Sequence, residues 1–163
     1  MISLVMDTSN SYLAVGLFQD NMCLEAFQEK GSRRQSEKAI PTLKEVLDRH
    51  HIALKDVKEM IITSGPGSYT GVRVAMTIAK TLAAVSDVRI KSVSSLAAYA
   101  GMSQALSVID ARGHKVFVGV YENGLPLIKE QVVALEDFAQ LRAEYGDFEL
   151  VGEIGCLGFD EKE

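Results

Sequence analysis

The stretch Gly65-Pro66-Gly67-Ser68-Tyr69-Thr70-Gly71-Val72-Arg73 decides how this chain folds. An apolar segment, 57–63, precedes it and is predicted to be a strand, while the segment that follows, to about Val85, has the pattern of a helix. Gly65 and Gly67 allow the backbone to approach other groups closely, and Ser68 or Thr70 can cap the helix. The order strand, glycine loop, helix predicts an α/β fold.

The glycine loop admits two interpretations. Unpaired N–H groups at the start of a helix can hold an anion, and a carboxylate followed by hydroxyls ends the first predicted strand, so a phosphate site is one interpretation. That candidate site, a vestigial one, comprises Asp7, Thr8, Ser9, Gly65, Gly67, Ser68, Gly71 and Asp110. The other interpretation is a tight turn without a ligand, with the aspartates acting as local caps. The loop lacks the lysine of a P-loop after Gly71 and the third glycine of a dinucleotide fingerprint, where Thr70 stands.

The residues before and after the loop predict a first lobe over 1–103. Three strands in an antiparallel meander are predicted at 2–6, 12–18 and 22–28. A helix from Ser36 to about His51, a strand at 89–93 and a short helix at 94–100 complete this lobe.

The remaining residues, 104–163, repeat the same order of elements. Strands are predicted at 106–109, 116–121, 127–133 and 148–151, with a helix at 135–145 and a hairpin turn at Asn123-Gly124. Asp110 follows the first strand of this copy, as Asp7 does in the first. The second lobe stops after its fourth strand, so it is predicted to be incomplete, either truncated or naturally reduced.

Two helices carry apolar faces of different width. On the first, the apolar residues fall within about 120° of one face, whereas on the second they sweep about 200°. That arc is wider than one core contact needs, so either a second layer of this chain or a partner protein covers it. The candidate partner interface comprises Ile40, Leu43, Leu47, Val74, Ile78, Leu82 and Val85.

Composition excludes several classes of protein. The chain has 163 residues, 47% of them hydrophobic, and a formal net charge of −5, which disfavours a dedicated nucleic-acid binder. A small basic patch of Lys30, Arg33, Arg34 and Lys38 is the exception, or a solvated loop. No apolar run is long enough for a membrane span, and no basic segment and apolar run open the chain. We therefore predict a cytoplasmic protein whose two cysteines are reduced and mostly buried.

Metal and nucleophile chemistry have little support in the sequence. His50 and His51 are adjacent, and His114 stands alone, so no two imidazoles share a helical face. No serine lies in the pattern of a hydrolase nucleophile. We therefore predict no metal site and no catalytic residue.

Several segments together resemble the TsaB family, also called YeaZ-like. They are Met6-Asp7-Thr8-Ser9, the glycine loop through Arg73, Ser94-Ser95-Leu96-Ala97 and Ile109-Asp110-Ala111-Arg112. The resemblance covers residues 1 to about 122. It implies the actin/hexokinase/Hsp70-like (ASKHA) fold, with duplicated ribonuclease H-like lobes that each combine a mixed sheet with helices.

The resemblance also implies a function. Members of this family are non-catalytic subunits that bind and activate TsaD, a catalytic paralogue, in forming N6-threonylcarbamoyladenosine at position 37 of tRNAs that read ANN codons. TsaD holds a metal through a His-x-x-x-His pair that this chain lacks. The ATPase TsaE joins the complex, and this chain is expected to contact tRNA through the complex. ATP or ADP with Mg is expected only at a complex interface. The helices at 36–51 and 68–85 would pack on TsaD or, in a homodimer, on a second copy.

Two other functions stay open. One is an ATP-dependent kinase or phosphohydrolase of the same fold, with Asp7 as a ligand of metal-bound water and Asp110 as base. The other is a peptidase, for which no nucleophile can be located. Gln35 stands where many relatives carry a histidine, so any role of that imidazole does not carry over.

Overall fold

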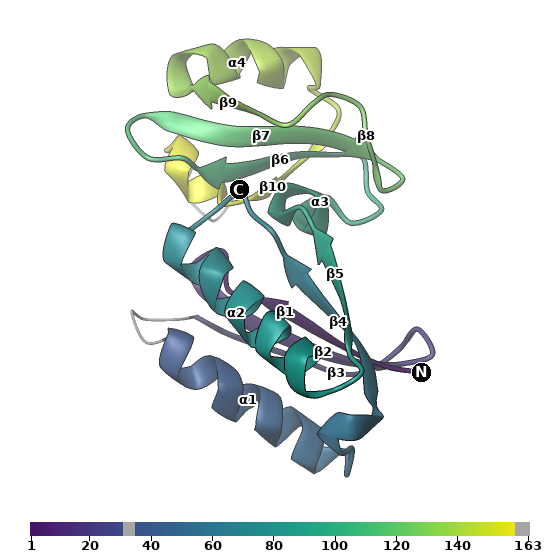
Figure 1. Ribbon diagram of the computed structural model, residues 1–163. Helices are drawn as coiled ribbons and strands as arrows, with labels where there is room; N and C mark the ends of the chain where they lie inside the picture. The colour runs from purple at the N-terminus through teal and green to yellow at the C-terminus, as the bar shows by residue number, and fades with distance from the viewer. Residues whose placement is uncertain (31–34, 159–163) are drawn as a thin grey trace. The chain divides into compact units, whose positions relative to one another are not determined.

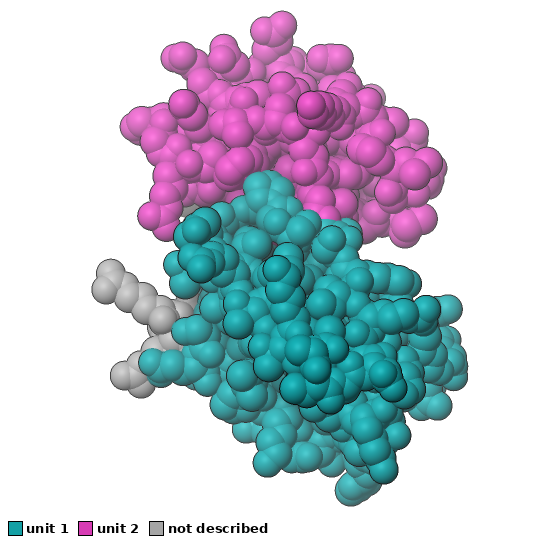
Figure 2. Space-filling view, viewed as in Figure 1, with its two compact units in different colours: residues 1–93 teal, residues 94–163 magenta. Residues whose placement is uncertain are grey.

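The computed structural model describes residues 1–30 and 35–158 and divides the chain into two compact units (Figure 1). Unit 1 is Met1–Val93, and unit 2 begins at Ser94 (Figure 2). The division falls before the predicted boundary at residue 103, because the short helix α3 (Ser95–Ala100) packs on the strands of unit 2.

Unit 1 is built on a five-stranded mixed sheet with the order β3-β2-β1-β4-β5. The meander is confirmed: β1 pairs antiparallel with β2, and β2 with β3. β4 and β5 extend the sheet in parallel from β1. The strands are β1 (Ile2–Asp7), β2 (Tyr12–Gln19), β3 (Met22–Lys30), β4 (Val57–Thr63) and β5 (Arg89–Val93).

Two helices pack on one face of this sheet: α1 (Gln35–Arg49) on β2, and α2 (Tyr69–Val85) on β4 and β5. A 3-10 turn, Leu54–Asp56, links α1 to β4. Alternate strand residues, among them Leu4, Met6, Met60 and Ile62, are fully buried beneath the helices. Burying each such side chain contributes about 1.5–3 kcal/mol, so this layer holds the helices in place.

Unit 2 repeats the sheet in shorter form, with the order β10-β6-β7-β8 and with β9 also paired to β7. β6 pairs antiparallel with β7 and parallel with β10, as β1 does with β2 and β4, so the predicted repetition is confirmed. Over residues 94–158 no strand takes the place that β5 has in unit 1. The elements are β6 (Ala105–Asp110), β7 (Lys115–Glu122), β8 (Leu125–Pro126), β9 (Gln131–Ala134), α4 (Leu135–Glu144), β10 (Glu149–Gly152) and a 3-10 turn (Ile154–Leu157).

The prediction of a single strand at 127–133 is wrong. The turn at Asn123-Gly124 has positive φ at both residues, and the chain pairs with β7 as soon as it leaves the turn, at Leu125. That pairing ends at Pro126, and β9 then pairs with the other half of β7. The predicted strand therefore overlaps only β9; β8 lies before it, and residues 127–130 belong to no strand.

Three further predictions can be compared with the structure. Arg33 and Arg34 of the predicted basic patch lie outside the described residues. Cys156 is half-buried, but Cys23 is exposed on the edge strand β3, so the prediction of mostly buried thiols is wrong for Cys23. None of the helices that the structure describes is long and apolar enough to cross a membrane.

Candidate functional site

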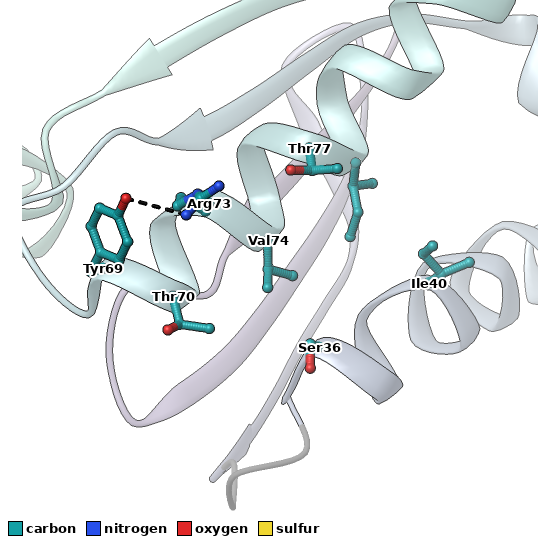
Figure 3. Close-up of a pocket in the computed structure, with 8 residues that line it drawn as sticks. Ser36, Ile40, Tyr69, Thr70, Arg73, Val74 and Thr77 are labelled. Carbon is teal, nitrogen blue, oxygen red and sulfur yellow. Dashed lines mark hydrogen bonds between the residues drawn. The ribbon is translucent and has the colours of Figure 1, made fainter.

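A groove of about 330 Å³ lies between α1 and α2 on unit 1 (Figure 3). α1 contributes only Ser36 and Ile40, one turn apart, and α2 contributes the rest. The side chains of Val74 and Ile78 give the groove an apolar lining, and threonines add hydroxyls. The residues that line it are Ser36, Ile40, Tyr69, Thr70, Arg73, Val74, Thr77 and Ile78.

Large side chains stand exposed beside this groove. Tyr69 is 75% exposed and Ile40 is 61% exposed. The guanidinium carbon of Arg73 lies 5.2 Å from the centroid of the Tyr69 ring, and its Nη1 donates a 3.2 Å hydrogen bond to the Tyr69 hydroxyl (Figure 3). Such a cation–π contact contributes about 0.5–1 kcal/mol at an exposed site, so Tyr69 and Arg73 orient one another.

The predicted interface residues fall into three groups. Ile40, Val74 and Ile78 line the groove. Leu43 and Leu47 are buried under α1, and Leu82 packs half-buried against the same core. Val85, the last residue of α2, is exposed but does not line the groove.

Sequence reasoning missed the polar part of the groove, which includes Ser36, Thr70 and Thr77, and it missed Tyr69 and Arg73. Counting aliphatic residues on a helical wheel selects core positions first, because most aliphatic side chains of a helix are buried in the core. The available signal was the spacing of Tyr69 and Arg73, which are four residues apart and therefore neighbours on one helix face.

Contacts at both ends of α1 place Ile40 beside the groove. At the start, the Gln35 side-chain amide donates to the Asn10 carbonyl at 3.0 Å. At the end, the Glu25 carboxylate of β3 pairs with Arg49 and lies 2.8 Å from Nε2 of His50. The hydrogen bond from Arg49 holds the pKa of Glu25 below its usual value, so this anchor stays charged at neutral pH.

Asp7 ties together the carboxyl ends of β1 and β4. Its Oδ1 accepts hydrogen bonds from the Ser9 amide (2.8 Å), the Ser9 hydroxyl (2.6 Å) and the Thr63 hydroxyl (2.6 Å). Its Oδ2 accepts one from the Asn10 amide nitrogen at 3.1 Å. The predicted capping geometry of Asp7 is therefore present, because the carboxylate accepts the backbone N–H two residues on.

The glycine loop packs directly on the backbone that follows β1. A Cβ on Gly71 would lie 1.8 Å from the Thr8 carbonyl oxygen, and one on Gly67 would lie 2.2 Å from that of Ser9. The Thr8 hydroxyl donates to the Gly71 carbonyl at 2.6 Å, which locks the contact. The chain's own backbone thus occupies the space that these glycines open.

The remaining loop residues act as turn formers. Gly65 has φ +96°, a conformation that favours glycine, although the space around it is open enough for a Cβ. Ser68 caps α2, as the sequence predicts: its Oγ accepts from the Gly71 amide at 3.2 Å. The tight-turn interpretation therefore accounts for the geometry of the loop.

Asp110 belongs to unit 2 and makes the same local contact as Asp7. Its carboxylate accepts the Arg112 amide at 2.7 Å, and its own amide donates to the Glu153 carboxylate at 2.9 Å. Burial, with a further contribution from the Asp110 charge, raises the pKa of Cys156 to about 11, so this thiol stays protonated. Within residues 1–30 and 35–158, no group of three or more His, Cys, Asp or Glu side chains could hold a metal.

Replacing Asp7 by alanine is expected to lower the free energy of unfolding by about 2–4 kcal/mol, because the Thr63 hydroxyl and both Ser9 donors lose this acceptor. Asp7→Asn keeps an oxygen at the position of Oδ1 and is expected to lose about 1 kcal/mol. Urea unfolding of the full chain measures both. A change below about 0.5 kcal/mol in the alanine variant would show that these contacts do not hold the loop.

Comparison with known proteins agrees with this fold. Residues 28–149 match the family described as "TsaD: tRNA N6-adenosine threonylcarbamoyltransferase". The chain is 33% identical to the tRNA threonylcarbamoyladenosine biosynthesis protein TsaB of Bacillus subtilis, over 88% of this chain and 67% of that protein. The TsaB of Escherichia coli is 30% identical over 75% of this chain and 57% of its own length.

Solved structures give the same result. YeaZ from Pseudomonas aeruginosa matches with a TM-score of 0.75 and 28% identity, over 82% of this chain and 67% of that one. The two lobes of mixed sheet and helix, together with the family match, define a TsaD-like protein of the ASKHA fold. Within that class, the chain belongs to the TsaB family, whose members take part in the biosynthesis of threonylcarbamoyladenosine in tRNA.

Proposed function

We propose that this chain is a non-catalytic subunit that binds and activates the TsaD paralogue through α1 and α2 of unit 1. The product of the complex is N6-threonylcarbamoyladenosine at position 37 of tRNAs that read ANN codons. TsaE is a further partner, and the chain contacts tRNA through the complex. The observation that carries the proposal is the groove between α1 and α2, with exposed Ile40 and Tyr69 beside it.

This groove has the composition of a protein interface. Aromatic and arginine side chains are enriched at the centres of such interfaces, and Tyr69 and Arg73 supply both. Ile40 and Val74 offer aliphatic surface that a facing helix would remove from water. Burying an exposed isoleucine contributes about 1.5–3 kcal/mol, enough for one side chain to matter to affinity.

The contacts of Asp7 support a subunit without catalytic groups. Three donors from Ser9 and Thr63 already use Oδ1, and Asn10 uses Oδ2, so the carboxylate is engaged in holding the loop. A kinase or phosphohydrolase would need this carboxylate for metal-bound water. The geometry therefore favours the subunit over the enzyme.

Reconstitution tests the proposal. Threonylcarbamoylation of tRNA by TsaD and TsaE, with ATP and threonylcarbamoyl-adenylate as the donor of the group, is measured with and without the full chain. We expect modification only when the chain is present, and no ATP turnover by the chain alone. ATP turnover by the chain alone, with no effect on modification, would overturn the proposal in favour of the kinase or phosphohydrolase.

Ile40→Glu is expected to weaken binding to TsaD at least about 30-fold, because it places a charge beside the apolar groove without disturbing the core. Isothermal titration measures the Kd, and circular dichroism checks that helix content is unchanged. Met22→Glu is the matched control, since Met22 is equally exposed, at 62%, as the first residue of the edge strand β3. Equal losses in the two variants, or none in Ile40→Glu, would count against this surface.

A further inference from the structure

Among the groove-lining residues that the structure describes, Arg73 has the single charged side chain. α2 contains no acidic residue, and its other charged residue, Lys80, does not line the groove. Among the described residues no carboxylate pairs with Arg73; its guanidinium lies over the Tyr69 ring and donates a hydrogen bond to the Tyr69 hydroxyl. The groove therefore combines an apolar lining with one fixed positive charge.

A partner that covers the groove must satisfy this charge. Arginine stays protonated at every pH at which proteins fold, so it cannot lose its charge when water is excluded. Covering it with apolar side chains alone would leave a buried unpaired cation, which strongly disfavours binding. A carboxylate matches the planar guanidinium and can accept two hydrogen bonds from it.

Tyr69 prepares Arg73 for this contact. The ring faces the guanidinium and the hydroxyl accepts from Nη1, so the side chain is already oriented before a partner arrives. Orientation in advance reduces the rotamer freedom lost on binding. No residue in the described ranges accepts a hydrogen bond from Nη2 or Nε of this guanidinium, so both can donate to an acceptor on the partner.

We propose that the helix of TsaD that fills this groove carries a carboxylate that pairs with Arg73, and that this pair selects the partner by charge. The inference rests on the proposed function, because it names the chemistry of the partner at the same groove. Arg73 is thus a specificity residue of the interface, while Ile40 and Val74 supply its apolar contact area.

Titration of the full chain against TsaD at low and high salt tests the proposal. Arg73→Gln is expected to weaken binding about tenfold or more and to reduce its salt dependence, since a charge pair is lost. Arg73→Glu is expected to weaken binding about 100-fold or more, because like charges then face each other. Lys80→Gln on the same helix is the matched control and should leave Kd within about twofold.

A charge exchange gives the second measurement. One Asp→Lys or Glu→Lys variant of TsaD should restore binding to Arg73→Glu by at least about tenfold while weakening binding to the unchanged chain. If no acidic position of TsaD restores it, the proposal is overturned. Loss of affinity in Arg73→Gln with unaltered salt dependence would also overturn it, because neutral carbonyl groups would then be the acceptors.

The two proposals can fail separately. If Ile40→Glu weakens binding and Arg73→Gln does not, the groove binds TsaD without a charge pair, and only the inference fails. If neither variant weakens binding, the proposed function fails at this surface. If Arg73→Glu changes only the self-association of the chain, measured by light scattering, the carboxylate lies on a second copy, and the inference is overturned.

Discussion

Gly71→Ala is expected to destabilise the chain by about 3 kcal/mol or more, one of the largest effects of any conservative change. Helix propensity alone predicts the opposite sign: Gly71 lies inside α2 without positive φ, so alanine should stabilise the helix by about 1 kcal/mol. The structure overrides propensity because the new Cβ would lie 1.8 Å from the Thr8 carbonyl oxygen. Backbone cannot yield there without moving α2 away from β1.

Urea unfolding of the full chain measures this change, and hydrogen exchange of peptides from β1 and β4 shows whether unit 1 is the part that opens. Gly146→Ala is the matched control, because its Cβ would meet nothing closer than 3.6 Å and its φ is ordinary. An increase in the stability of Gly71→Ala would show that propensity governs this position and that the contact with Thr8 is not close.

The glycine loop also shows what a sequence can and cannot predict about a site. A backbone that must pass close to a phosphate and a backbone that must pass close to another backbone both need glycine. The pattern predicted a close approach at Gly65 and Gly67 and left its partner open. The structure confirms the prediction at Gly67, whereas at Gly65 it is wrong because a Cβ there would meet nothing closer than 3.6 Å. Gly71 makes a further close approach that was not predicted. Only the fold, which brings Thr8 and Ser9 to the start of α2, identifies the neighbour.

The elements with strong local signals were predicted well. The meander, α1, α2 and the repeated strand order follow from alternation and helical periodicity, because each buries one face. The strand predicted at 127–133 overlaps only β9, because apolar residues at both ends of that segment, 127–128 and 132–133, suggested one continuous strand. Pairing along β7, which depends on residues distant in sequence, decided where each short strand ends.

The groove was predicted in part, for a physical reason. A helical wheel places Ile40 and Leu43 within one apolar arc, yet the core of unit 1 buries only part of that arc. Leu43 is 6% exposed in the core of unit 1, whereas Ile40 is 61% exposed beside α2. The sequence gives the width of an apolar arc, but only the packing shows which part of that arc the core buries.

This division into a buried and an exposed part predicts opposite effects of substitution at two residues three positions apart on α1. Leu43→Glu is expected to destabilise the chain by about 4 kcal/mol or more, because it removes a buried leucine and places a carboxylate among apolar side chains. Ile40→Glu, by contrast, is expected to change the free energy of unfolding by no more than about 0.5 kcal/mol and to weaken binding instead. Urea unfolding at pH 7 separates the two.

The pH dependence gives the Leu43→Glu prediction a sign as well as a size. Burial disfavours the charged form, so the pKa of the introduced carboxyl would be higher in the folded chain than in the unfolded one. A folded pKa above the unfolded value means that the destabilisation shrinks as pH falls from 7 toward about 4.3. Leu43→Gln, measured at the same pH, is the control. We therefore expect the difference in the free energy of unfolding between Leu43→Glu and Leu43→Gln to become smaller as the pH falls from 7 to 5. A difference that stays constant would place the carboxyl in water, and α1 would then have to lie differently on the sheet.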